Sequence, residues 1–384
     1  MELFAQKKRR YKSRGELMKT KHLIVIVIFI ISIGCSSGVG GTQEKLKPKK
    51  IKSFQPLEER VVDGWRGALD GDRLVAKSDD KLTVIDLATN KQLASISVEY
   101  EAGFDISGNY VVWSDLRNEQ TSIGELGSYD EANADIFLYN LSTGEERQLT
   151  TDSSAQIQPR IWENYMVWMD NSSDTVKEYP THWQIVLYNI ETGEQKTITS
   201  GDGGHTDPDI DAGNVVWEDG RHVTKRGLRG GGNLPENNTD IYLYRIETGE
   251  TIPIAIESYK EGLPRVSGNL ITWEAFNGSY KGNAFVYDTV TEKTLQVTNL
   301  AVDQRTPVIH GKFVAWMDER NGSSTHDVGP GPHDSDIYLA DLEKGTEVRI
   351  SGEGPQILPL ISDRWIVYGK STDAGAVLTA VRHR

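Results

Sequence analysis

The feature that most constrains the fold of this chain is an internal repeat. An apolar segment that ends near a tryptophan recurs along the sequence, as in ISGNYVVWSD and VSGNLITWEA. Its copies lie at 106–115, 161–170, 212–219, 266–275 and 309–318, with weaker copies at 69–76 and 361–368. A period of roughly 45–50 residues is typical of the blades of a β-propeller.

A second segment follows each of these copies, with a pattern such as DIFLYNLSTGEERQLT. It lies at 135–150, 184–199, 240–254, 283–298 and 336–351, while 82–98 is the first copy and 376–381 begins the last. Alternating apolar residues of β-branched and aromatic type predict strands, and S-G-N and T-G-E predict tight turns. Each unit is therefore expected to be four antiparallel strands, a to d, with the tryptophan on strand b. The chain contains no long amphipathic helical pattern, so the predicted class is all-β.

The repeats predict seven blades, because six units are complete and the seventh lacks only strand d. Residues of about 50–63, just before the first unit, could supply that strand, which would close the ring by pairing the two termini and remove a free sheet edge. A six-bladed ring with an odd end is the alternative. The recurring tryptophans are expected to pack between blades: Trp113, Trp168, Trp217, Trp273 and Trp316.

The amino-terminal region has the pattern of an export signal. Basic residues precede an apolar run from Leu23 to Ile33, and the small residues around Cys35 follow it. That run of about 11 residues is shorter than the roughly 20 that a membrane-spanning helix needs. The segment ISIGCSSG resembles a lipoprotein processing site, which implies lipid attached to Cys35. We therefore expect a lipoprotein-type signal peptide over 1–34, a flexible tether over 35–56 and a propeller over 57–384. An uncleaved anchor is the alternative.

The repeats resemble the TolB-like propeller family, whose units carry an I-x-G-x-x-V-x-W-x-D-x-R segment followed by D-I-Y-x-Y-x-L-x-T-G. The resemblance covers about 320 residues and implies a propeller of the exported, surface-protein type. Its members include periplasmic binding scaffolds, surface proteins, the propeller parts of some peptidases and metal-dependent lyases of pectate oligomers. The resemblance thus implies the fold without selecting a function.

One equivalent position near the start of strand a is polar in six of the seven units. It is occupied by Glu101, Gln156, His205, Glu261, Gln304 and Gln356. Repeats arranged around an axis would bring these side chains toward the mouth of the central channel, where carboxylates, amides and an imidazole could bind a cation or a sugar. The alternative is that they cap the strand starts and order water.

Two further groups of polar residues raise the question of a metal. Aspartates end strand b and begin strand c in several units, which would suit calcium, but an arginine follows two residues later in three of them. An Asp–Arg clamp at the base of the loop explains that pattern without a metal. His326, Asp327, His333 and Asp334 share one glycine- and proline-rich loop, which could bind a transition metal or be a mobile polar loop.

The charge of the chain limits the classes of partner that it can bind. The formal charge is −14, and the first 34 residues hold eight Lys/Arg and two Asp/Glu, so their removal leaves about −20. Such a surface repels nucleic acid and suits cations, basic partners or neutral glycans. No cofactor is expected, apart from a divalent cation such as calcium.

We therefore expect an extracytoplasmic, membrane-tethered binding or scaffold propeller whose partner is a protein or glycan of the cell envelope, docked on the long-loop face. The alternative is a propeller enzyme, a polysaccharide lyase or hydrolase in which Glu101, Glu261 and His205 act as acid, base or metal ligands.

Overall fold

The structure, a computed structural model, describes the repeat region apart from several connections. The described residues are 44–47, 49–50, 53–99, 101–118, 133–172, 182–201, 203–223, 238–276, 281–321, 335–351, 354–372 and 375–384. They contain strands and turns, and no helix within them could span a membrane. Cys35 and the histidine-containing loop lie outside these residues.

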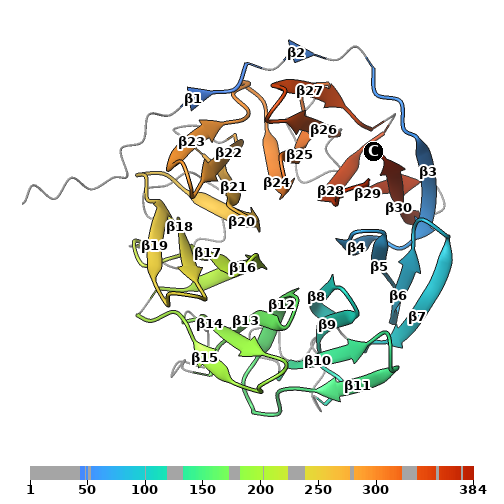
Figure 1. The fold of residues 1–384 in the computed structure, drawn as a ribbon, viewed down its shortest axis with the longest axis vertical. Coiled ribbons are helices and arrows are strands. Elements are labelled where there is room, and N and C mark those ends of the chain that lie inside the picture. Colours follow the sequence, from blue (N-terminus) through green and yellow to red (C-terminus); the bar gives the residue numbers. More distant parts are fainter. Residues whose placement is uncertain are drawn as a thin grey trace, which may run out of the picture. The chain divides into compact units, whose positions relative to one another are not determined.

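Seven four-stranded antiparallel sheets form a closed ring, so the chain is a seven-bladed β-propeller (Figure 1). Blade 1 is β4 (Arg66–Asp70), β5 (Arg73–Ser78), β6 (Lys81–Asp86) and β7 (Lys91–Ser97). Blade 2 is β8 (Glu101–Ser107), β9 (Tyr110–Asp115), β10 (Asp135–Asn140) and β11 (Glu145–Gln148). Blade 3 is β12 (Gln156–Trp162), β13 (Tyr165–Asp170), β14 (Gln184–Asn189) and β15 (Gln195–Thr197). Blade 4 is β16 (His205–Asp211), β17 (Asn214–Asp219), β18 (Asp240–Arg245) and β19 (Thr251–Ala255).

The remaining blades follow the same order, with the first strand of each nearest the ring centre. Blade 5 is β20 (Glu261–Ser267), β21 (Leu270–Ala275), β22 (Asn283–Asp288) and β23 (Lys293–Gln296). Blade 6 is β24 (Gln304–His310), β25 (Phe313–Asp318), β26 (Asp336–Asp341) and β27 (Thr346–Arg349). Blade 7 is β28 (Gln356–Ile361), β29 (Trp365–Thr372), β30 (Gly375–Arg382) and the amino-terminal strand β3 (Glu58–Asp63).

The ring is closed by the strand that precedes the first repeat, as the repeat count predicts. Strand β3 pairs antiparallel with β30 over six residue pairs, from Glu58–Arg382 to Asp63–Val377. Blades 7 and 1 are also joined through Asp72, whose carboxylate accepts hydrogen bonds from Trp365 Nε1 at 2.9 Å and from Arg364 at 2.7 Å. The two ends of the repeat region therefore hold each other in place.

Two short strands precede β3 within the stretch that the sequence indicates as a tether. Strand β1 (Glu44–Lys45) pairs in parallel with β23, and β2 (Lys49–Lys50) pairs in parallel with β27. In Figure 1 this segment follows the outer rim of blades 5 and 6 before it reaches blade 7. The outermost strand of a blade exposes unpaired backbone groups, and an extended chain beside it can satisfy them.

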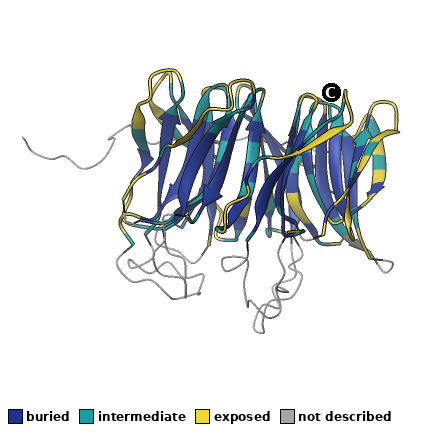
Figure 2. Ribbon diagram, turned by 90° about the horizontal axis from the view of Figure 1, so that it is seen from below, coloured by how far each residue is buried: buried dark blue, intermediate teal, exposed yellow. Residues whose placement is uncertain are grey.

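The core consists of seven apolar clusters, each of which lies between two adjacent blades. The five repeated tryptophans belong to these clusters and are at most 2% exposed, which confirms their predicted packing role. Trp113, for example, stacks on Phe137 with ring centroids 5.6 Å apart and belongs to the apolar cluster between blades 1 and 2. Figure 2 shows the resulting pattern, with buried strands between exposed turns.

Candidate functional site

The innermost strand of blades 2 to 7 carries a β-bulge that faces the ring centre. In each of these blades the pairing with the second strand shifts register at the same place. A proline follows the bulge residue in blades 3 to 7, and because proline has no N–H it cannot donate to the ladder there. The bulge residues all have positive φ: Gly103, Gln158, Asp207, Leu263, Thr306 and Leu358. A bulge re-aims the local side chains, here toward the channel.

Buried acids hold several of these bulges. The Glu274 carboxylate accepts a hydrogen bond from the Thr306 N–H at 3.0 Å, across the junction of blades 5 and 6. Glu218 lies in the equivalent place at the junction of blades 4 and 5, where a Cβ on Gly262 would come within 2.5 Å of its Oε2. Burial raises the pKa of Glu218 to about 7. These acids hold backbone and do not line the central cavity.

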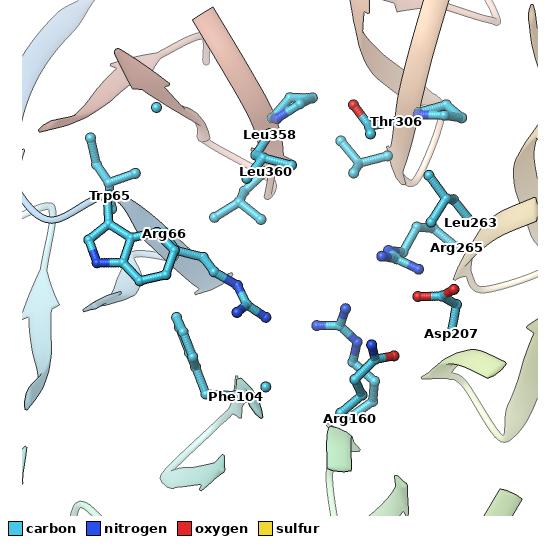
Figure 3. A pocket seen from close by; sticks show the side chains of 18 of the residues that line it. Trp65, Arg66, Phe104, Arg160, Asp207, Leu263, Arg265, Thr306, Leu358 and Leu360 are labelled. Carbon is cyan, nitrogen blue, oxygen red and sulfur yellow. The ribbon is translucent and has the colours of Figure 1, made fainter. Parts of the chain in front are cut away.

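The bulges surround a central cavity of about 250 Å³ (Figure 3). Every blade contributes to its lining, and blade 4 contributes only Asp207. The position two residues after the bulge has an equivalent in every blade, including blade 1. From blade 1 to blade 7 it is occupied by Ala68, Asp105, Arg160, Asp209, Arg265, Val308 and Leu360. This position is therefore charged in blades 2 to 5 and apolar in blades 6, 7 and 1.

Three arginines from three blades point into the cavity, and Asp207 is the one carboxylate in its described lining. Arg66 lies on the Phe104 ring and 3.4 Å from Glu101 Oε1. Arg160 lies 3.9 Å from Asp209 Oδ1, and its buried Nε has no hydrogen-bond partner among the described residues. Desolvation and then the positive charge of Arg160 lower the pKa of Arg265, while the nearby aspartates act in the opposite direction.

The carboxylates behind these arginines are engaged with backbone. Asp105 accepts a hydrogen bond from the Ile161 N–H at 3.0 Å, and Asp209 accepts one from the Val266 N–H at 2.8 Å. Burial raises the pKa of Asp105 to about 6 and also raises the pKa of Asp209. Each of these backbone bonds uses the Oδ2 atom, and Asp209 Oδ1 is the oxygen that lies 3.9 Å from Arg160.

The six site residues indicated by the sequence occupy a different layer. Each is the first residue of the innermost strand of its blade, is at most 8% exposed, and is absent from the lining of the central cavity. Four of them stand directly opposite the aspartate that ends the second strand: Glu101 opposite Asp115, Gln156 opposite Asp170, His205 opposite Asp219 and Gln304 opposite Asp318. Glu261 stands opposite Ala275, and Gln356 stands opposite Lys370.

These six side chains have partners close to their own strand starts. Gln304 donates to Asp318 at 2.8 Å, Gln156 to Asp152 at 2.9 Å, and Gln356 to the Gly354 carbonyl. His205 Nδ1 lies 2.9 Å from the Trp183 carbonyl oxygen, and Glu101 accepts from the Gly103 N–H. Glu261 accepts from the Glu257 N–H at 3.4 Å, and burial raises the pKa of Glu261 to about 9. The geometry matches strand capping, while ligand binding by these residues stays a prediction.

The Asp–Arg clamp expected at the loop base is confirmed in three blades. The pairs are Arg117–Asp115 at 2.7 Å, Arg221–Asp219 at 2.7 Å and Arg320–Asp318 at 2.6 Å. In each, the same aspartate accepts the Nε1–H of the repeat tryptophan, at 3.2, 2.9 and 2.8 Å. In the part of the chain that the structure describes, no group of three or more His, Cys, Asp or Glu is placed to hold a metal. A bound calcium stays untested.

The arginines of the cavity were not singled out from the sequence. Alignment on the polar position at the strand start selects buried side chains that do not line the cavity. Moving the same alignment four residues along, past the proline, selects Arg160 and Arg265. The alternation of acidic and basic residues at this place, between otherwise apolar positions, is the signal that would have found them.

No protein-family model matches the sequence, and no curated protein matches it significantly. Among solved structures, an oligogalacturonate lyase in complex with manganese is 12% identical, with 89% of this chain and 99% of that chain covered and a TM-score of 0.56. The β-propeller domain of the Trilobed protease from Pyrococcus furiosus is 13% identical, with coverage of 85% and 94% and a TM-score of 0.55. TolB from Acinetobacter baumannii is 12% identical, with coverage of 83% and 78% and a TM-score of 0.42. At these identities the likeness concerns the fold.

Proposed function

We propose that this chain is a binding propeller that takes an anionic ligand into its central cavity. The observation that carries the proposal is the convergence of Arg66, Arg160 and Arg265, from three blades, on one cavity with a single carboxylate in its described lining. A guanidinium group offers a planar fork of donors that fits carboxylate and phosphate oxygens. A ligand of this kind would offset the repulsion between Arg160 and Arg265, which both also attract Asp209.

The proposal locates the ligand in the channel rather than at the ring of strand-start residues. The strongly negative formal charge of the protein opposes the approach of an anion, so the attraction has to come from the three arginines at the cavity itself. The fold is shared by binding scaffolds and enzymes, so it does not choose between them. No observation among the described residues favours the enzymatic alternative.

A substitution of Arg160 tests the proposal. We expect Arg160→Gln to weaken the binding of small anions by about tenfold to a hundredfold, because a hydrogen bond to a charged group contributes about 1.5–3 kcal/mol. The measurement is isothermal titration calorimetry with acetate, citrate, phosphate and sulfate at constant ionic strength. Arg147→Gln is the matched control, since Arg147 is an exposed arginine on the outer strand β11. Equal affinities for the two variants, or no binding by the unaltered protein, would refute the proposal.

We further propose that the propeller is exported and held at a membrane by lipid on Cys35, where a protein or glycan of the envelope would supply the anion. The support is the order of basic residues, apolar run and small residues before Cys35. Two acyl chains on one cysteine suffice for stable anchoring. We expect Cys35→Ser to move the protein from the membrane fraction to the soluble fraction, while Ser36→Ala leaves it in place. Retention of the Cys35→Ser protein in the membrane fraction would contradict lipid anchoring.

A further inference from the structure

We infer that the ligand of the central cavity is a compact carboxylate that carries an apolar group, with the carboxylate among the arginines and the apolar group against blades 6, 7 and 1. This inference rests on the proposed function and names the chemical class of its ligand. Two sources share this chemistry: a free aryl or alkyl carboxylic acid, and the carboxyl-terminal residue of a peptide that ends in an apolar side chain.

The two halves of the cavity differ in chemistry. On one side lie Arg160, Arg265 and Asp207, and Figure 3 shows both guanidinium groups directed inward. On the other side the lining of blades 6 and 7 contains no charged residue. It consists of Thr306, Pro307, Val308, Leu358, Pro359, Leu360, Gly369 and Leu378. Arg66 lies between the halves, beside Trp65. A simple inorganic anion would use only the first half.

Two large apolar side chains of the second half are exposed. Trp65 is 47% exposed and Leu358 is 45% exposed. Eight large apolar side chains among the described residues are exposed, and two of them, Trp65 and Leu358, line this cavity. Exposed apolar surface at a concave polar-edged site is characteristic of ligand recognition. An apolar group bound there would remove both side chains from water.

The backbone at Leu358 is also unusual. Its φ is +51°, a left-handed conformation that a leucine rarely adopts. The equivalent bulge positions in blades 2 to 6 carry glycine, glutamine, aspartate, leucine and threonine. Blade 5 carries Leu263 in the same conformation on the other half of the cavity, so this conformation is not specific to the apolar half.

Room on this side comes from Gly369, where other blades have a larger side chain. The equivalent residues on the second strand are Met169, Glu218, Glu274 and Met317, among others. A Cβ at position 369 would lie 3.1 Å from Ile357 Cγ1, so a larger side chain there would require Ile357 to shift. The volume of about 250 Å³ is small for a ligand pocket, which favours a compact acid over an extended oligomer.

The test compares probes that separate charge from apolar group. By calorimetry, we expect the unaltered protein to bind 3-phenylpropionate at least tenfold more tightly than acetate, and 3-phenylpropionamide at least tenfold more weakly than 3-phenylpropionate. Leu358→Asn should lose the preference for 3-phenylpropionate over acetate while it still binds acetate. Asparagine tolerates positive φ, so this variant keeps the bulge. Leu93→Asn, on the outer strand β7, is the control for loss of an exposed leucine. If Leu358→Asn lowers the melting temperature, Trp65→Ala replaces it as the second variant.

The outcomes separate this inference from the proposed function. Equal binding of acetate and 3-phenylpropionate, or a preference that survives both Leu358→Asn and Trp65→Ala, would overturn the inference while anion binding through Arg160 stands. Unchanged binding of both acids by Arg160→Gln would instead overturn the proposed function. Comparing N-acetyl-Gly-Gly-Leu with its carboxamide identifies the source: acid-dependent binding of this peptide indicates a peptide carboxyl terminus, and binding of the free acids alone indicates a small organic acid.

Discussion

Replacing Val62 with aspartate is expected to destabilise the ring by about 4 kcal/mol or more, while the same change at its neighbour Val61 has little effect. Both residues lie on β3, and because side chains alternate along a strand they face opposite sides of blade 7. Val62 is 6% exposed and contacts the cluster of Trp365, Leu74 and Leu378 between blades 7 and 1. Val61 is 65% exposed. A carboxylate at position 62 would be buried without a partner.

Urea unfolding followed by tryptophan fluorescence measures this difference. The unaltered protein, Val61→Asp and Val62→Asp would be compared at the same pH, and a lower midpoint at an unchanged slope would report lost stability. Fluorescence is well placed to detect opening at this junction because Trp365 is 1% exposed within it. Equal midpoints for the two variants would mean that β3 does not close blade 7.

Replacing Asp318 with alanine is expected to cost about 3 kcal/mol or more, because its carboxylate ties the loop base to the core. It accepts hydrogen bonds from Trp316 Nε1 and Gln304 Nε2 at 2.8 Å each. It also accepts from the Arg320 N–H and Nε at 2.9 Å and from Nη2 at 2.6 Å. Asp318, Trp316 and Gln304 are fully buried, so their donors would be left unsatisfied.

The matched control for Asp318 is Asp288→Ala. Asp288 accepts hydrogen bonds from the Val290 N–H at 2.9 Å and the Thr291 hydroxyl at 2.9 Å, but it does so in an exposed turn where water can replace it. Its loss should cost about 1 kcal/mol or less. Blade 5 is a natural comparison, since Ala275 stands in the place of the aspartate and Trp273 Nε1 lacks a hydrogen-bond partner among the described residues. Thermal unfolding of both variants decides the matter, and similar melting temperatures would show that the clamp is dispensable.

The fold could be predicted well from the sequence because the same strand pattern recurs in each repeat. Each tryptophan segment predicts the same strand, and each T-G-E predicts the same turn. A unit whose strand pattern is weak can therefore be assigned from the other units. The same repetition showed that the seventh unit lacked a strand, which residues of about 50–63 were predicted to supply, and Glu58–Asp63 form β3 in that place. The pairing of β1 and β2 with the rim was not predicted, since two-residue parallel contacts leave no periodic signal.

The candidate site was harder to predict because its residues are selected by backbone geometry. The polar residues at the strand starts share one alignment position, but a β-bulge two residues later changes which side chains face the channel. The sequence pattern that accompanies the bulge is the proline that follows it in blades 3 to 7. Arg66 lies in blade 1, which lacks both bulge and proline, so no repeat alignment would place it beside Arg160.

The closure of blade 7 has a consequence for biosynthesis. Strand β3 is made before any blade, yet its partner β30 is made after the other six blades. The ring cannot be sealed until β30 has been made, so β3 stays without its partner while some 300 residues are synthesised. Contacts between residues so distant in sequence also slow folding. Until β30 has been made, both edges of the open ring therefore expose unpaired backbone groups.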